Sequence, residues 1–166
     1  IEPELSTGDN RYQTKDFGPQ EVEIGSEFLE FPLVLYIHLN RFFFDKKKCK
    51  VVLNNSRFEF PSSIDFAPYL AEDSPQKSED MIYDLFGVIA HAGEITSGHF
   101  YAFLRTDPKE DIDKWYKFND SHVLFSNKKE AIIDNFGGRK NEEKQHYSAY
   151  ILIYMRRNEL ENLFCP

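Results

Sequence analysis

The pattern of hydrophobic and polar residues along the chain predicts a protein built mainly from strands. Residues 33–37 are apolar at every position and lead into residues 40–44, which contain three consecutive phenylalanines. An unbroken apolar run is typical of a strand covered on both faces, so we expect this strand to lie centrally in a sheet. Residues 57–60 alternate polar and apolar side chains before Pro61, which predicts a short, half-buried strand.

Alternating or apolar segments in the second half of the chain predict five more strands, at residues 82–90, 100–105, 115–118, 123–125 and 148–155. The first two flank a turn of small residues around Gly93 and predict an antiparallel hairpin. The next two are separated by the polar turn of residues 119–121 and predict a second strand pair. The last segment predicts a final buried strand.

One helix is predicted after the second strand pair. Asn127 can cap its start, Glu130 follows three residues later, and Gly137 with Gly138 ends it. The remaining segments predict loop and short pieces in residues 1–20, one helical turn in 64–70, a mobile surface loop in 71–80 and no clear structure in 157–166. We therefore predict an α+β fold, an antiparallel sheet with few helices, in which residues 1–156 form one unit and 157–166 a tail.

Composition and charge narrow the classes of partner. The chain has 166 residues, 41% of them hydrophobic and 16% aromatic, which suits one domain and favours sheets. Its 28 acidic and 20 basic residues give a net charge of −8, which argues against nucleic acid and anionic membranes as partners. The basic run of residues 46–50 lacks interleaved aromatic residues, so we interpret it as a solvated loop.

The two cysteines, Cys49 and Cys165, form no CxxC pair and predict neither a disulfide framework nor a zinc site. A reducing intracellular setting, cytoplasmic and/or nuclear, fits this cysteine usage. The longest apolar run, residues 149–155, is too short to span a membrane. The acidic start at residues 1–4 does not resemble a signal peptide, and we expect that the chain is cut from a longer protein.

His99 is a candidate general base. Gly98 precedes it and residues 93–97 are small or polar, so the backbone can approach a ligand closely while the following strand fixes the imidazole. An imidazole that activates a thiol needs an acceptor on its other nitrogen, and Asn119 or Asp120 can supply one. Taken alone, a histidine at the start of a strand is more often structural than catalytic, and the two acceptors would be interpreted as ordinary turn residues.

Metal chemistry is not expected, and neither is a cofactor. His91, His99, His122 and His146 lack the four-residue spacing of a helical ligand pair, and no cysteine lies near them. Cys49 lies in the basic loop and Cys165 is one residue from the end. We interpret both thiols as structural, which leaves the candidate base without a nucleophile in this chain.

Four separated segments resemble the second half of the ubiquitin-specific protease family, in order and approximate spacing. They are Leu33 to Phe42, Gly98 to Phe103, Trp115 to Asp120 and Ser148 to Tyr154. Residues 8–12, 20–21, 57–61 and 135–138 are most similar to the herpesvirus-associated branch of that family and its fungal relatives. The resemblance implies a papain-like fold with fingers, palm and thumb, of which this chain would supply the palm and part of the fingers.

The resemblance also implies a function. Members of the family are deubiquitinases that hydrolyse the bond after the C-terminal Gly-Gly of ubiquitin by a Cys-His-Asn/Asp mechanism. His99 would be the general base and Asn119 or Asp120 its orienting partner, with the nucleophilic cysteine upstream of this chain. The tail of ubiquitin would enter a channel lined by His38, Phe44, His91, Phe100 and Tyr150.

Ubiquitin, ubiquitinated proteins and the N-terminal half of the same domain are the implied partners, and the chain alone is expected to be inactive. Three departures stand out: no Asn/Gly-rich cysteine box is present, Phe100 replaces the usual tyrosine, and Asn119 stands where close relatives often have aspartate. The alternative is a catalytically inactive module of the same fold that binds ubiquitin or a partner. An unrelated β-rich scaffold would require the four matches to be coincidental.

Overall fold

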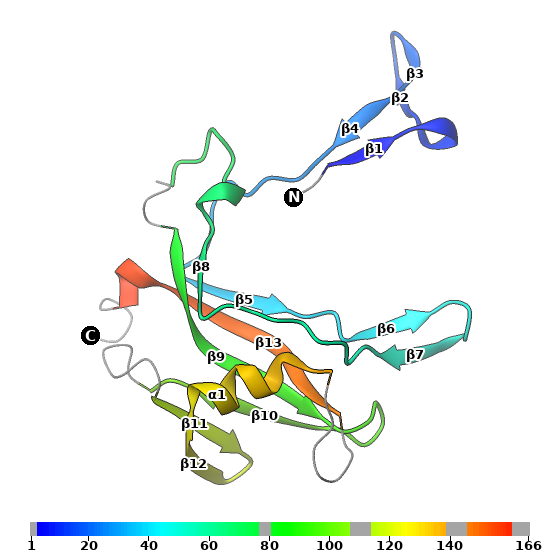
Figure 1. Cartoon of the computed structure of the whole chain (residues 1–166). Helices are drawn as coiled ribbons and strands as arrows, with labels where there is room; N and C mark the ends of the chain where they lie inside the picture. Colours follow the sequence, from blue (N-terminus) through cyan, green and yellow to red (C-terminus); the bar gives the residue numbers. More distant parts are fainter. Residues whose placement is uncertain (1–2, 77–80, 107–113, 139–145, 161–166) are drawn as a thin grey trace.

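The computed structural model describes residues 3–76, 81–106, 114–138 and 146–160, and its centre is a seven-stranded antiparallel sheet (Figure 1). Six strands lie in the order β12-β11-β10-β9-β13-β5, and β8 pairs with β9 beside them. The strands are β5 (Val34–His38), β8 (Ser63–Asp65), β9 (Ile82–Ala92), β10 (His99–Leu104), β11 (Lys114–Asn119), β12 (His122–Asn127) and β13 (Tyr147–Arg156). The predicted strand pairs 82–90 with 100–105 and 115–118 with 123–125 are confirmed as β9–β10 and β11–β12.

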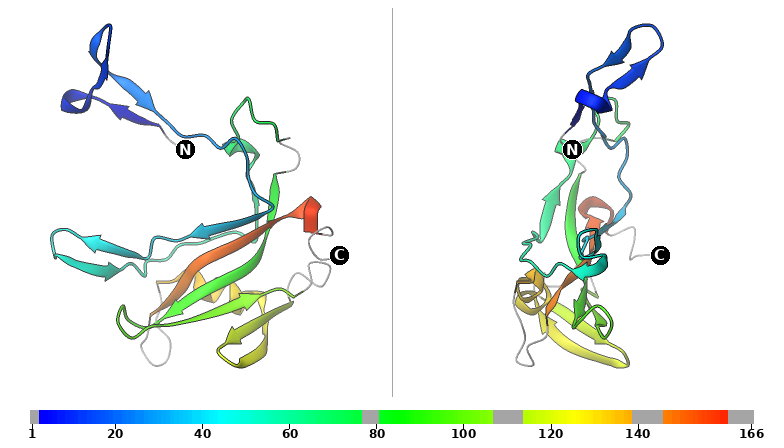
Figure 2. Two further views of the ribbon diagram at one scale, coloured as in Figure 1. Left: turned by 180° about the vertical axis from the view of Figure 1, so that it is seen from behind. Right: turned by 90° about the vertical axis from the view of Figure 1, so that its right-hand side faces the viewer.

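Three two-stranded ribbons lie outside this sheet. They are β1 (Glu4–Ser6) with β4 (Val22–Ile24), β2 (Tyr12–Thr14) with β3 (Gly18–Gln20), and β6 (Phe42–Asp45) with β7 (Lys50–Leu53). Seen from behind, they project from one side of the sheet as two arms (Figure 2). Residues 3–20 thus form short pieces, as predicted, with the turn η1 (Gly8–Asn10) among them.

The central strand of the sheet is β9, and the prediction that residues 33–37 lie centrally is wrong. Tyr83, Leu85 and Val88 of β9 are at most 2% exposed, because β10 and β13 flank this strand and side chains cover both its faces. Residues 34–37 of the apolar run lie in β5, which pairs, among the described strands, only with β13 and ends the sheet. Tyr36 is 66% exposed there, so the apolar run marks an open face of the described chain.

The predicted half-buried strand at residues 57–60 is also wrong. Only one of its two phenylalanines is buried, since Phe60 is 4% exposed and Phe58 is 49% exposed. The backbone, however, finds its partner outside a sheet, since the amide N–H of Phe58 donates to the carbonyl oxygen of Phe136 at 2.8 Å. An alternating sequence favours a strand, but it does not by itself fix the backbone conformation or bury both apolar side chains.

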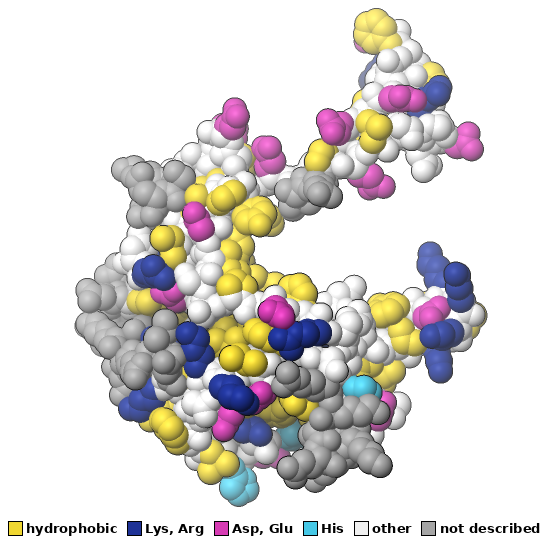
Figure 3. All heavy atoms as spheres, viewed as in Figure 1, with side chains coloured by type: hydrophobic (Ala, Val, Ile, Leu, Met, Phe, Trp, Pro, Cys, Tyr) yellow, Lys and Arg dark blue, Asp and Glu magenta, His cyan; other side chains and the backbone are white. Residues whose placement is uncertain are grey.

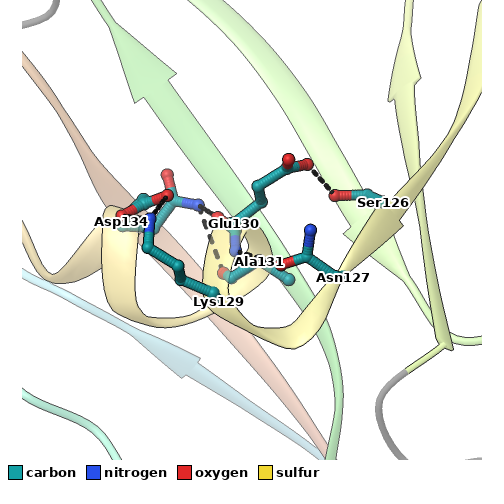
Figure 4. A network of polar contacts seen from close by, with 7 residues as sticks. Ser126, Asn127, Lys129, Glu130, Ala131 and Asp134 are labelled. Atoms are coloured by element: carbon teal, nitrogen blue, oxygen red, sulfur yellow. Dashed lines mark hydrogen bonds and ion pairs between the residues drawn. The ribbon is translucent and has the colours of Figure 1, made fainter.

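The predicted helix begins where the capping residue places it but is short. The side chain of Asn127 accepts a hydrogen bond from the N–H of Glu130 at 3.0 Å, which starts α1 (Lys128–Ala131). The 3₁₀ turn η4 (Ile133–Phe136) then continues to Gly137, whose φ of +82° ends the segment. Figure 4 shows the Glu130 carboxylate bonded to the Ser126 hydroxyl at 2.5 Å rather than folded back onto the cap.

Residues 64–76 are more ordered than predicted. The expected helical turn is η2 (Ala67–Tyr69), which follows β8. Within the predicted mobile loop, the Gln76 amide binds both the N–H and the carbonyl oxygen of Phe31, at 2.7 and 2.9 Å. These bonds fix residues 71–76 against the core; residues 77–80 lie outside the described part.

The described part of the tail also contacts the sheet. Arg157, at the start of η5 (Arg157–Glu159), makes two hydrogen bonds of 2.6 and 2.7 Å to the carboxylate of Asp84 on β9. Burial raises the pKa of Asp84, but the hydrogen bonds and charge of Arg157 outweigh it, and the net pKa is lowered. None of the helices in the described ranges is long and apolar enough to cross a membrane.

Candidate active site

The sheet brings His99 and Asn119 together. β10 and β11 are antiparallel neighbours with Ala102 opposite Phe118, so the start of β10 lies near the end of β11. Nε2 of His99 lies 2.6 Å from Oδ1 of Asn119. Because an amide oxygen only accepts hydrogen bonds, Nε2 carries the proton and Nδ1 keeps its lone pair. The ring is thus held in one tautomer with one basic nitrogen free.

Asp120 lies further from the imidazole than Asn119 does. It occupies the turn between β11 and β12 with a φ of +51°, a left-handed conformation that Asp tolerates better than most residues. Its Oδ2 is 3.9 Å from Nε2 of His99, beyond hydrogen-bond distance, and its side chain is 77% exposed. Of the two predicted acceptors, the geometry favours Asn119.

Tyr101 lies behind the His99 ring. The two rings are nearly parallel, at an interplanar angle of 23° and a centroid distance of 6.5 Å. The ammonium of Lys117 lies 4.3 Å from the Tyr101 ring centroid. Burial, reinforced by Tyr147, raises the pKa of Tyr101 to about 12, so its hydroxyl stays protonated at neutral pH. Tyr101 and Lys117 therefore support the His99 imidazole from the side of the sheet. The protonated Tyr101 hydroxyl does not compete for the proton of the imidazole.

Five rings from five strands form a continuous cluster next to His99. They belong to His38, Phe42, His91, Phe100 and Tyr150. Centroid distances are 4.6 Å for His38–Tyr150, 5.1 Å for Phe42–His91, 5.6 Å for Phe42–Tyr150, 4.8 Å for His91–Phe100 and 5.2 Å for Phe100–Tyr150. Four of the five residues predicted to line a channel therefore lie together.

The fifth predicted residue, Phe44, lies outside this cluster, and Phe42 takes part in its place. Phe44 is 60% exposed on β6, and it belongs to none of the cluster's ring contacts. Phe42 was missed in the sequence. Since side chains of a strand alternate, Phe42 and Phe44 share one face of β6, and this period of two could have identified Phe42.

His91 is buried, with 4% of its surface exposed. Burial lowers its pKa, although the charge of Glu94 opposes the shift. Protonation of His91 therefore favours the unfolded chain, whose histidines titrate near the ordinary value of about 6.5. Above pH about 6.5, we expect the full contribution of neutral His91 to folding stability to be present. This contribution is lost as pH falls through the lowered pKa of His91 in the folded chain.

Thermal unfolding at a series of pH values checks this expectation. The wild type should lose stability as pH falls below about 6.5, and His91→Gln should lose less across the same window, because glutamine does not titrate. Equal losses in both proteins over that window would contradict the assignment to His91.

Gly98 leaves no room for a side chain. A Cβ atom there would overlap the His91 ring and lie 2.7 Å from the carbonyl oxygen of Glu94. We expect Gly98→Ala to destabilise the turn before His99 by about 1–3 kcal/mol, as overpacking does. Hydrogen exchange of the peptide containing this turn measures the effect. Gly25→Ala, where the nearest atom is 3.4 Å away, is the control and should exchange like the wild type.

The remaining chemical candidates do not join this site. Cys49 is exposed in the turn of the β6–β7 hairpin, where its thiol contacts the Lys46 carbonyl oxygen at 3.5 Å. Cys165 lies outside the described residues. Within the ranges that the structure describes, no three His, Cys, Asp or Glu side chains gather in a way that could hold a metal ion.

Comparison with known proteins identifies the family. The model of the ubiquitin carboxyl-terminal hydrolase family matches residues 6–154. The chain belongs to this family. It is 37% identical to ubiquitin carboxyl-terminal hydrolase 15 of Schizosaccharomyces pombe and 34% identical to the protein of that name in Saccharomyces cerevisiae, with 100% of the chain covered in both. It is 37% identical to ubiquitin carboxyl-terminal hydrolase 7 of Drosophila melanogaster over 98% of the chain.

The chain spans about 15% of the length of the two fungal relatives and 14% of the fly protein. Membership of the ubiquitin carboxyl-terminal hydrolase family, together with the mainly antiparallel sheet and single α-helix of the described residues, confirms the predicted α+β, papain-like fold class.

Proposed function

We propose that this chain is the C-terminal half of a deubiquitinase catalytic domain, comprising the palm and part of the fingers. The observation that carries the proposal is the 2.6 Å hydrogen bond between His99 and Asn119 beside the ring cluster. The reaction is hydrolysis of the peptide or isopeptide bond after the C-terminal Gly-Gly of ubiquitin. The nucleophilic cysteine lies upstream of this chain, in the N-terminal half of the domain.

His99 acts as general base and then as general acid. Its free Nδ1 takes the proton of the cysteine thiol, and the thiolate attacks the carbonyl carbon of the last glycine of ubiquitin. The imidazolium then gives its proton to the departing lysine amine, which leaves a thioester. In the second acyl-transfer step, Nδ1 takes a proton from water, whose oxygen attacks the thioester carbonyl. The imidazolium returns this proton to the departing thiolate, which restores the thiol and releases ubiquitin. Asn119 holds the imidazole of His99 in the tautomer that both acyl-transfer steps require.

The ring cluster is the proposed channel for the tail of ubiquitin. Close-packed aromatic rings leave space for backbone but little for side chains, so a channel of this kind selects glycine next to the bond that is cleaved. Its lining consists of the predicted residues His38, His91, Phe100 and Tyr150 and of Phe42. Phe44 is proposed to contact the tail from the exposed end of β6.

The partners proposed are ubiquitin, ubiquitinated proteins and the N-terminal half of the same domain. We also propose that the protein belongs to the herpesvirus-associated branch of the family, because residues 8–12 and 135–138 are similar to that branch. A cytoplasmic and/or nuclear location is proposed from the cysteine usage of the chain, which lacks a CxxC pair.

Ubiquitin carrying a C-terminal vinyl electrophile tests the proposed activity in the full-length protein. We expect a single covalent adduct on a cysteine outside residues 1–166, and we expect His99→Ala to prevent its formation. Peptide mapping identifies the modified cysteine. An adduct on Cys49, or a folded protein that forms no adduct, would overturn the proposal.

One observation favours a second candidate function, a module that binds ubiquitin or a partner without catalysis. An apolar hollow of about 570 Å³, lined by Phe28, Leu35, Tyr36 and Phe66 among others, opens on the concave side of the molecule. Figure 3 shows hydrophobic side chains gathered along this concave side. Surfaces of this kind mark interaction sites. Ubiquitin binding by the full-length protein without adduct formation would favour this function.

A further inference from the structure

His99 is positioned by the turn that precedes it. Residues 93–98 connect β9 to β10, and the glycines at the two ends of this turn, Gly93 and Gly98, lie against each other. We call this pair of glycines the neck of the turn. A Cβ atom on Gly93, whose φ is +101°, would lie 3.1 Å from the Cα of Gly98 and 3.1 Å from the carbonyl oxygen of Ser97. Because His99 follows directly, any movement of this neck moves the imidazole.

His146, which lies outside the turn, forms a hydrogen bond with the neck. The N–H of Gly93 donates to the carbonyl oxygen of His146 at 2.7 Å, just beyond the last paired residues of β9 and β13. The side chain of His146 makes a second contact, with 2.9 Å between its Nδ1 and Nδ2 of Asn55. A side-chain amide nitrogen donates, so Nδ1 of His146 accepts in this pair.

Hydrogen bonds to the carbonyl oxygens of Asn55 and its two neighbours hold the backbone at Asn55 in place. The buried guanidinium of Arg41 donates to the carbonyl oxygens of Asn54 and Ser56 at 3.2 and 2.6 Å, on either side of Asn55. The carbonyl oxygen of Asn55 accepts from the N–H of Gly138 at 2.7 Å. The backbone of Asn55 is therefore fixed, and its amide offers His146 a stationary partner.

We propose that Asn55 and His146 are positioning residues for the histidine of the active site, which they hold through the neck of the turn; the inference rests on the proposed function. The route runs from Arg41 through the backbone of Asn54 and Ser56 to Asn55, His146, Gly93 and His99. Neither positioning residue touches the reacting atoms. Their side chains limit the movement of the base, and small errors in its position are costly to the reaction.

A double-mutant cycle in the full-length protein tests this inference. The variants are Asn55→Ala, His146→Ala and the double variant, assayed on ubiquitin with a C-terminal fluorogenic coumarin amide. We expect each single variant to lower kcat by about 10-fold with little change in KM, since couplings between contacting residues reach this size. The double variant should be no slower than the slower single variant, because all three lose the contact between Asn55 and His146.

Two further variants separate positioning from general stability. His146→Gln offers a side-chain oxygen that can accept from Asn55, and it should restore most of kcat. Asn54→Ala is the matched control: among the described residues, the Asn54 side chain bonds only within its own turn, to the N–H and hydroxyl of Ser56, at 3.0 and 2.6 Å. It should leave kcat unchanged. Additive losses in the cycle, or unchanged kcat in both single variants, would overturn the inference.

Hydrogen exchange provides a measurement that does not depend on activity. Asn55→Ala and His146→Ala should each speed exchange in the peptide covering residues 92–100, whereas Asn54→Ala should not. Unchanged exchange in both single variants would also overturn the inference. A wild-type protein that fails to hydrolyse the coumarin substrate would count against the proposed function alone, because the exchange experiment still tests the contact.

Discussion

Replacing His99 with alanine in the full-length protein is expected to lower kcat by about 10²- to 10⁴-fold, the range that general acid–base catalysis supplies. The loss arises because nothing else in the described site can take the thiol proton and return it to the leaving amine. Steady-state hydrolysis of the ubiquitin coumarin substrate measures it. An activity within a few fold of the wild type would show that another group is the base.

The two acceptors near His99 should differ in the same assay. Asn119→Ala removes the 2.6 Å hydrogen bond and frees the ring, so kcat should fall by more than 10-fold, in line with other groups that orient a catalytic histidine. Asn119→Asp keeps an acceptor in place and should retain most activity. Asp120→Ala should have the smaller effect of the two alanine variants, and a larger one would reassign the orienting role to Asp120.

Arg41→Met is expected to cause the largest loss of stability. Four carbonyl oxygens accept from the Arg41 guanidinium, which is 4% exposed: those of Asn54, Ser56, Phe136 and Ala149. Burial lowers its pKa, yet arginine remains protonated at neutral pH. Methionine fills part of the volume but donates no hydrogen bond, so we expect a cost of about 3 kcal/mol or more from the unpaired carbonyls.

Hydrogen exchange of peptides from β5 and β13 in the full-length protein measures this cost. A loss of about 3 kcal/mol corresponds to roughly 100-fold faster exchange in segments that open with the sheet. Arg57→Met is the control, because Arg57 forms an exposed ion pair with Glu59 at 2.8 Å. It should cost less than about 1 kcal/mol. Similar exchange in the two variants would show that the buried guanidinium does not hold these segments together.

The strand content of the fold could be predicted from the sequence, but the place of each strand could not. Periodicity identified both hairpins and the closing strand because local alternation reflects local burial. It could not distinguish β5 from β9, since both are rich in apolar residues and only the pairing order places β9 in the middle. The segment 57–60 shows the same limit: its alternating sequence predicts a strand, whereas its backbone partner is a 3₁₀ turn distant in sequence and Phe58 stays exposed.

The candidate site was predictable where residues act through local motifs. His99 and Asn119 lie at strand ends next to turns that the sequence marks with small or polar residues. Contacts between distant segments were not predictable, because no spacing encodes them. The Asn55–His146 pair joins residues 91 positions apart, and neither residue stands in a pattern that singles it out. Arg41 was visible only as the end of an apolar run.

The neck between Gly93 and Gly98 also separates two kinds of sequence change. Side chains cannot be added at the neck, whereas Glu94, Ile95 and the other tip residues are exposed to solvent. Mutations that accumulate in the tip, including changes in its length, therefore need not displace the imidazole. Under the proposed function, selection could vary the surface that this loop offers to a substrate while the imidazole of His99 keeps its position.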